Sequence, residues 1–216
     1  MADSSAIDSP GDGIMTAPIE AVVREVLRKR DRGARVRRSI LAAWDTLKQK
    51  YPERARWRRK STRAHIVWED AVDNLITALA DDPGAVIQRH HDTVSFIFDD
   101  RVLLRIKKAD IELKSSNVQT DLASLFHDHE ADLFGYKGLQ RIEAAYVLNQ
   151  FETDIVWVGA VARDGNLQLF HFQFDELVAP AKGPILFPLP RKTSPADLAI
   201  PKRSGSGRRK PEGQGE

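Results

Sequence analysis

Apolar residues recur at helical spacing in three segments of the first 80 residues. Within each segment, residues three or four positions apart are apolar and most positions between them are charged or polar, which is typical of helices that bury one side. The pattern predicts helices over 18–30, 35–50 and 62–80. Pro18 suits a first helical turn, and we expect Gly33 to end the first helix.

The spacing of apolar residues becomes strand-like further along the chain. Five strand candidates follow from the alternation and from β-branched and aromatic residues: 94–98, 102–106, 142–148, 155–161 and 167–174. Asp99-Asp100 and Asp164-Gly165-Asn166 are turn signals between neighbouring strands. The predicted fold class is α+β, with a three-helix N-terminal layer packed on an antiparallel sheet of about five strands formed from 86–107 and 140–176.

The two ends of the chain have the composition of disordered segments. Residues 1–15 are small, acidic and Gly-rich, and residues 179–216 are rich in Pro, Gly and basic residues. We therefore expect a disordered leader, one α+β domain over 16–178 and a disordered basic tail. Inside the domain, 110–138 is far longer than the usual connection of about 4–6 residues, which indicates a loop with a function or with short helices of its own.

Composition excludes several classes of protein. The chain has no cysteine, which excludes disulfides, zinc–thiolate and iron–sulfur sites and a thiol nucleophile. It has no long apolar run and no signal peptide, so we expect a cytoplasmic protein without membrane contact. The net charge of +2 conceals strong segregation: 24–63 carries 16 Lys and Arg against 4 Asp and Glu, and 121–154 carries 2 against 7. This asymmetry suggests two surfaces with different partners.

Two short patterns raise the question of metal-dependent chemistry. Glu112-Leu113-Lys114 has the acid-x-lysine spacing of a large nuclease superfamily, and Asp99 or Asp100 could supply a preceding acid. However, the tripeptide runs into polar residues and has no apolar strand around it.

A second pattern is rich in histidine. His127-Asp128-His129-Glu130, with His90-His91, offers potential metal ligands that would converge on a strand, although a solvated polar loop is the simpler interpretation. No phosphate loop or nucleophile elbow is present, so we predict no catalytic residue, no metal, no cofactor and no enzyme activity.

The basic N-terminal helices offer another function. Their 16 cations could neutralise several phosphates and give salt-dependent binding to nucleic acid. The sequence therefore leaves open a DNA-binding regulatory protein, or a weak nonspecific DNA contact. Arg-rich helix faces are also common as solvated surface.

The loop 110–138 contains two stretches that resemble the peptides by which replication and repair proteins dock on the DNA sliding clamp. The first comprises Gln119, Leu122, Leu125 and Phe126, with one residue more than the usual bacterial form before its Leu-Phe pair. The second comprises Glu130, Asp132, Leu133 and Phe134 and has the shorter form, with Glu in place of Gln. In such peptides the aliphatic and aromatic side chains enter an apolar pocket and the amide bonds at its rim. The alternative is that these apolar residues pin the loop to the sheet.

On the motif at 119–126 and on its general organisation, the chain resembles the SocB family, the replication-inhibiting toxins of an alphaproteobacterial toxin–antitoxin system. The resemblance implies a toxin that occupies the peptide pocket of the sliding clamp, the DNA polymerase III β subunit, and so stalls replication forks. It also implies two further partners, a proteolytic adaptor antitoxin of the SocA type and the ClpXP protease. If Phe126 is a free anchor outside the sheet, Phe126→Ala should weaken clamp binding about thirtyfold and leave the fold intact.

Overall fold

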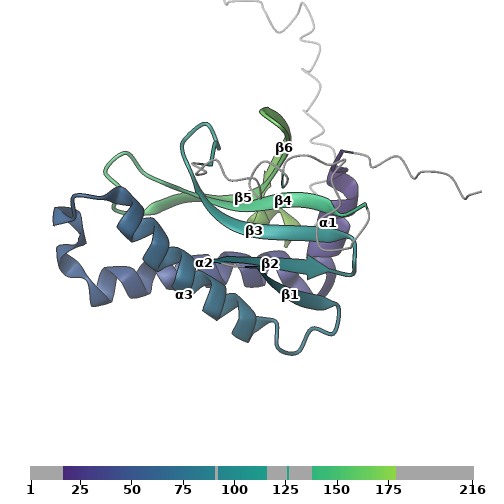
Figure 1. The fold of residues 1–216 in the computed structure, drawn as a ribbon, viewed down its shortest axis with the longest axis horizontal. Coiled ribbons are helices and arrows are strands. Elements are labelled where there is room, and N and C mark those ends of the chain that lie inside the picture. Colours follow the sequence, from purple (N-terminus) through teal and green to yellow (C-terminus); the bar gives the residue numbers. More distant parts are fainter. Residues whose placement is uncertain (1–16, 91, 116–125, 127–137, 179–216) are drawn as a thin grey trace, which may run out of the picture. The chain divides into compact units, whose positions relative to one another are not determined.

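The computed structural model describes residues 17–90, 92–115, 126 and 138–178. Helices come first and strands second, so the α+β class is confirmed (Figure 1). The α-helices are α1 (Glu20–Arg28), α2 (Arg32–Lys50) and α3 (Lys60–Ala78). The strands are β1 (Ala85–His90), β2 (Thr93–Phe98), β3 (Val102–Ala109), β4 (Gln140–Leu148), β5 (Ile155–Asp164) and β6 (Leu167–Gln173). None of the described helices is both long enough and apolar enough to cross a membrane. The predicted disordered leader and tail lie outside the described residues.

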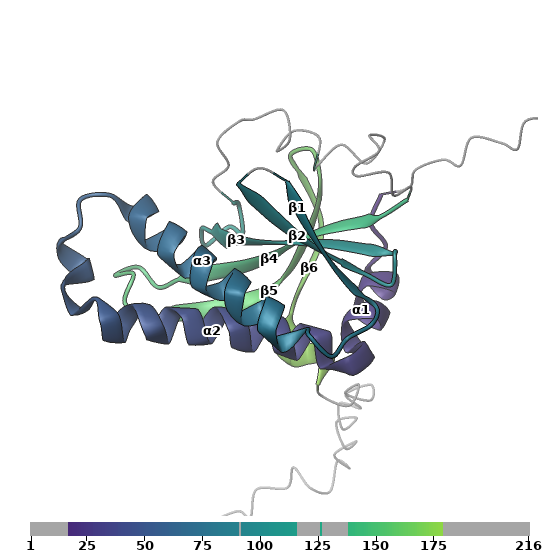
Figure 2. The ribbon, with the colours of Figure 1, turned by 60° about the horizontal axis from the view of Figure 1, so that its bottom comes forward.

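The predicted three-helix layer differs from the structure. The two long helices α2 and α3 lie along one face of the sheet, and the short α1 crosses its end (Figures 1 and 2). The break between α1 and α2 falls at Arg30 and Asp31, whose φ angles of 51° and 55° are left-handed and cannot continue a helix. Gly33 does not end α1, as its sequence position suggested, because it lies inside the first turn of α2. The tip of the Leu177 side chain, from the chain after β6, packs closely against Gly33, so a larger residue there would have to displace it.

The main core fills the space between α2, α3 and one face of the sheet. The apolar stripes read from the sequence supply it: Val36, Ile40, Trp44 and Leu47 of α2 and Val67, Ala71, Val72 and Leu75 of α3 are buried. The sheet contributes alternate residues, since successive strand residues face opposite sides. Phe172 of β6 and Phe174 just after it also enter this core.

The sheet has six strands in sequence order, and it is mixed. All neighbours are antiparallel except β3 and β4, which run parallel from Val102↔Gln140 to Ala109↔Val147. The prediction of an antiparallel sheet of about five strands was therefore one strand short, and it was wrong about the direction of the β3–β4 pair. The additional strand, β1, is an edge strand that pairs only with β2, and the polar residues at its end concealed it.

The parallel pair explains the length of the segment between β3 and β4. A connection between parallel neighbours must return along the length of the strands, which takes a dozen or more residues. Residues 110–138 are this crossover, and we call them the crossover segment. Its length thus has a topological reason in addition to any functional one.

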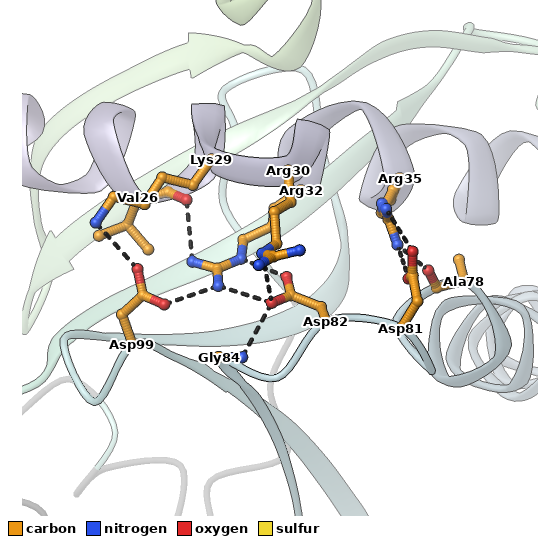
Figure 3. Close-up of polar contacts among 10 residues, drawn as sticks. All are labelled: Val26, Lys29, Arg30, Arg32, Arg35, Ala78, Asp81, Asp82, Gly84 and Asp99. Atoms are coloured by element: carbon orange, nitrogen blue, oxygen red, sulfur yellow. Dashed lines mark hydrogen bonds and ion pairs between the residues drawn. The ribbon is translucent and has the colours of Figure 1, made fainter.

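A buried ionic network holds the helices to the sheet (Figure 3). The Arg32 side chain is 2% exposed and donates to both carboxylate oxygens of Asp82, with Nε 2.6 Å and Nη2 3.0 Å away. Nη2 also donates to Oδ1 of Asp99 at 2.7 Å. Asp82 follows α3 and Asp99 lies in the β2–β3 turn, so one guanidinium joins three parts of the chain. Lys29 adds a further ion pair with Asp99, at 3.2 Å.

Acid should weaken this network. Hydrogen bonds from Arg32 hold the pKa of Asp82 below its ordinary value and lower the pKa of Asp99 to about 2. Because both values lie below the unfolded-state value near 3.9, the ionised carboxylates stabilise the fold above about pH 4, and this stabilisation disappears as the pH falls toward about 2. We expect the urea midpoint to fall steeply over this range, and less steeply in Asp99→Asn. Asp100→Asn, at an exposed carboxyl in the same turn, is the matched control. Equal pH profiles for the three proteins would contradict the assignment.

Candidate functional site

The sheet face turned away from α2 and α3 carries an unusual set of charged residues. Leu104 and Ile106 of β3 and Ile142 of β4 belong to the helix-side core, so their strand neighbours face the other way. We call the polar residues of this second face the sheet-face cluster: Ser95, Arg105, Lys107, Arg141, Glu143 and Arg163. Four of these side chains are cationic and one is a carboxylate, which gives the cluster a net charge of about +3 at neutral pH.

Register and hydrogen bonds connect the cluster. Arg105 and Glu143 are partners in the parallel β3–β4 ladder. Ser115 Oγ donates to Glu143 Oε1 at 2.8 Å, and Arg163 Nε lies 3.8 Å from Glu143 Oε2. Arg105 Nε donates to Ser95 Oγ at 2.9 Å. The side chains come from β2, β3, β4 and β5, so only the assembled sheet brings them together.

Burial and mutual repulsion destabilise the charged state of two of these cations. Burial and, to a smaller extent, the charge of Arg141 lower the pKa of Arg105 to about 10, against the opposing effect of Glu143. Burial likewise lowers the pKa of Lys107, against the opposing effect of Glu143. Arg105 is still charged at neutral pH.

Phe126 lies on this same face. Its ring is 3% exposed and packs with Ile97, Leu103 and Leu139. The guanidinium carbon of Arg105 lies 4.4 Å from the ring centroid, in cation–π geometry. Phe126 is therefore not a free anchor, because its side chain packs against the sheet face. The other residues of the two candidate clamp motifs, Gln119, Leu122 and Leu125 and then Glu130, Asp132, Leu133 and Phe134, lie outside the described residues.

The structure does not assemble the residues of the nuclease pattern. Glu112 and Lys114 lie in a tight turn after β3, where Asp110 Oδ1 accepts hydrogen bonds from both backbone N–H groups, at 2.9 and 2.8 Å. Their exposed side chains pair with each other at 2.7 Å. Asp99 is bonded to Arg32 in the ionic network. Glu112 and Lys114 therefore do not share a strand face with a preceding acid.

The possible histidine metal site is only partly described. His90 lies in β1, whereas His91 and 127–130 lie outside the described residues. Among the side chains that the structure does describe, no three His, Asp or Glu residues gather as a metal site would require.

The basic surface is smaller than the sequence suggested. Carboxylates from turns and from the chain after β6 pair with most cations of α1, of α2 and of the turn between them: Arg24 with Glu176, Lys29 with Asp99, Arg30 and Arg32 with Asp82, Arg35 with Asp81, Arg37 with Asp175, and Lys48 with Asp154. The paired residues are 46 to 152 positions apart in the sequence and meet only in the folded chain, so periodicity could not reveal the pairing.

One group of cations keeps its charge unneutralised. Within the described part of the chain, Lys50, Arg54, Arg56, Arg58 and Arg59 form no ion pair, and all but Arg54 are exposed. We call this group the basic tip. It occupies the connection between α2 and α3, at the end of the helices remote from α1 (Figures 1 and 2). Tyr51 and Trp57 pack edge to face, with ring centroids 5.4 Å apart, and brace this connection.

Comparison with known proteins adds no identification. No protein family model, no curated protein and no solved structure matches the chain. The function therefore has to be inferred from the sheet face, from Phe126 and from the basic tip.

Proposed function

We propose that this protein is a toxin that inhibits DNA replication by binding the peptide pocket of the DNA sliding clamp, and that an adaptor antitoxin delivers it to ClpXP. Two clamp-type motifs in a single crossover segment support the proposal. The observation that carries it is the location of Phe126, which ties this segment to the sheet face opposite α2 and α3.

Burial of Phe126 bears on the choice between the two motifs. Exposing a buried Phe costs about 1.5–3 kcal/mol, and losing the contact with Arg105 costs about 0.5–2 kcal/mol more. Micromolar binding provides only about 8 kcal/mol in total. We therefore assign docking to the second motif, Glu130–Phe134, and assign to Phe126 the role of holding the crossover segment on the sheet. On the sequence alone, Gln119–Phe126 was the preferred motif, and this assignment reverses that preference.

Phe134→Ala should weaken binding to purified clamp about thirtyfold, because an aromatic anchor contributes about 2 kcal/mol to such a contact. Surface plasmon resonance without DNA measures the affinity, and a urea titration checks that stability is unchanged. Phe151→Ala is the matched control, since Phe151 is an aromatic residue of the β4–β5 turn that is 80% exposed.

Two outcomes would count against this assignment. Failure of the unaltered protein to bind clamp would overturn the proposed function itself. Full clamp binding by Phe134→Ala, together with loss of binding by a stably folded Gln119→Ala variant, would return docking to the first motif.

The basic tip favours a second function, nucleic-acid binding by a DNA-binding regulatory protein. Its five cations have no ion-pair partner among the described residues, in contrast to most cations elsewhere on α1 and α2. Salt separates the two functions, because an apolar clamp contact depends little on ionic strength, whereas phosphate contacts weaken steeply as salt rises.

A further inference from the structure

A half-open hollow of about 280 Å³ lies beside the basic tip. The connection between α2 and α3 lines one side with Arg54, together with Lys60 and Arg63 from the first turn of α3, and the β4–β5 turn lines the other with Phe151 and Glu152. Ion pairs from Lys60 and Arg63 to Glu152 join the two walls. The hollow therefore belongs to a braced part of the fold.

Phe151 is held in an exposed position at this hollow. Its side chain is 80% exposed, although a Phe gains free energy by burial. The turn that carries it is well bonded, because Asn149 Oδ1 accepts from the N–H of Thr153 at 2.9 Å and Asn149 Nδ2 donates to Thr153 Oγ1 at 2.7 Å. A rigid turn that presents an aromatic face to solvent offers a surface for stacking.

The charge around the hollow is positive. Burial alone would raise the pKa of Glu152, but Lys108, Lys60 and Arg63 together hold that pKa below its ordinary value. Glu152 therefore stays ionised, and three cations share its single negative charge. Arg54 at the wall and the exposed Arg56, Arg58 and Arg59 along the connection have no carboxylate partner among the described residues. The surface is complementary to a chain of negative charges.

We propose that this end of the protein binds single-stranded nucleic acid, with phosphates along the basic tip and one unpaired base stacked on Phe151. The inference rests on the second proposed function, nucleic-acid binding, and specifies its ligand. An aromatic ring stacks on an unpaired base of any identity, and neighbouring cations follow the backbone. Duplex DNA offers the phosphates but keeps its bases stacked on one another, so it gains nothing from Phe151.

The test is fluorescence anisotropy of the full chain with a labelled oligo-dT of about 15 nucleotides and with a duplex of the same length, from about 50 to about 200 mM salt. The single strand should bind more tightly than the duplex, and Phe151→Ser should weaken single-strand binding about tenfold without changing duplex binding. Leu167→Ser, at an apolar residue that is 66% exposed in β6, is the matched control.

A second pair of variants tests the phosphate contacts. The double variant Arg58→Gln/Arg59→Gln should reduce the slope of log affinity against log salt by about 1.4, which is about 0.7 for each lost contact with a single strand. Arg28→Gln/Arg89→Gln removes two exposed cations outside the basic tip and should leave the slope unchanged.

The outcomes distinguish the two levels of the proposal. If neither oligonucleotide binds, nucleic-acid binding and the inference both fail. If the duplex binds as tightly as the single strand and Phe151→Ser has no effect, nucleic-acid binding stands and the single-strand inference is overturned. Binding that is unchanged in both the Phe151 and the Arg58/Arg59 variants would place the contact elsewhere and would also overturn it, as would equal affinity for poly-glutamate.

Discussion

Replacement of Arg32 by methionine is expected to lower the free energy of unfolding by about 3–5 kcal/mol, because removing one partner of a buried ion pair leaves an uncompensated charge. The Asp82 side chain is fully buried, and Asp99 is three-quarters buried. Proteins of this size are stable by only about 5–15 kcal/mol, so the variant should lose a large part of its stability. Urea denaturation followed by circular dichroism measures the change.

Two further variants separate the ionic network from a general effect of removing an arginine. Arg28→Met, at an exposed position in α1, should change stability by less than about 0.5 kcal/mol. Asp82→Asn should be destabilising alone and should cost much less in the Arg32→Met background, since the partner is already absent. Additive losses would show that Arg32 and Asp82 stabilise the fold independently and would contradict the network.

Phe126→Ala is expected to lower the free energy of unfolding by about 3 kcal/mol, because the ring is 3% exposed among Ile97, Leu103 and Leu139. The sequence alone predicted an intact fold for this variant. Urea denaturation again provides the measurement, and Phe151→Ala is the control with an exposed ring.

The result also decides how the crossover segment is used. A loss of stability assigns Phe126 to the sheet and leaves the second motif for the clamp. If Phe126→Ala unfolds at the same urea concentration as the unaltered protein, Phe126 does not stabilise the sheet face, and the first motif regains its role as the docking peptide.

Local patterns determined much of the fold. The spacing of apolar residues located α2 and α3, because each helix buries a single stripe whose period is visible in the chain. The turns predicted at Asp99-Asp100 and at Asp164-Gly165-Asn166 are confirmed. Asp99 and Asp100 both have φ 50°, and Gly165 has φ 53°, so residues that tolerate left-handed backbone stand where the hairpins turn.

Strand direction was not available from the same patterns. Alternation marks a strand but is identical in parallel and antiparallel ladders, so the β3–β4 pair could not be recognised as parallel. The edge strand β1 was missed because an edge strand buries few of its residues. Because the parallel direction of β3 and β4 was not recognised, the sequence also did not explain why the segment 110–138 between them is so long.

For the candidate sites too, some features follow from the sequence and others only from the tertiary structure. The sequence by itself determined where positive charge is concentrated and where the clamp-type motifs lie, since both are properties of neighbouring residues. Only the tertiary structure decided which charges remain unpaired, which aromatic side chain is buried and which is exposed. Ion pairs such as Arg24–Glu176 and contacts such as Arg105–Phe126 join residues distant in the chain, and their existence depends on the packing of the whole sheet and its helices.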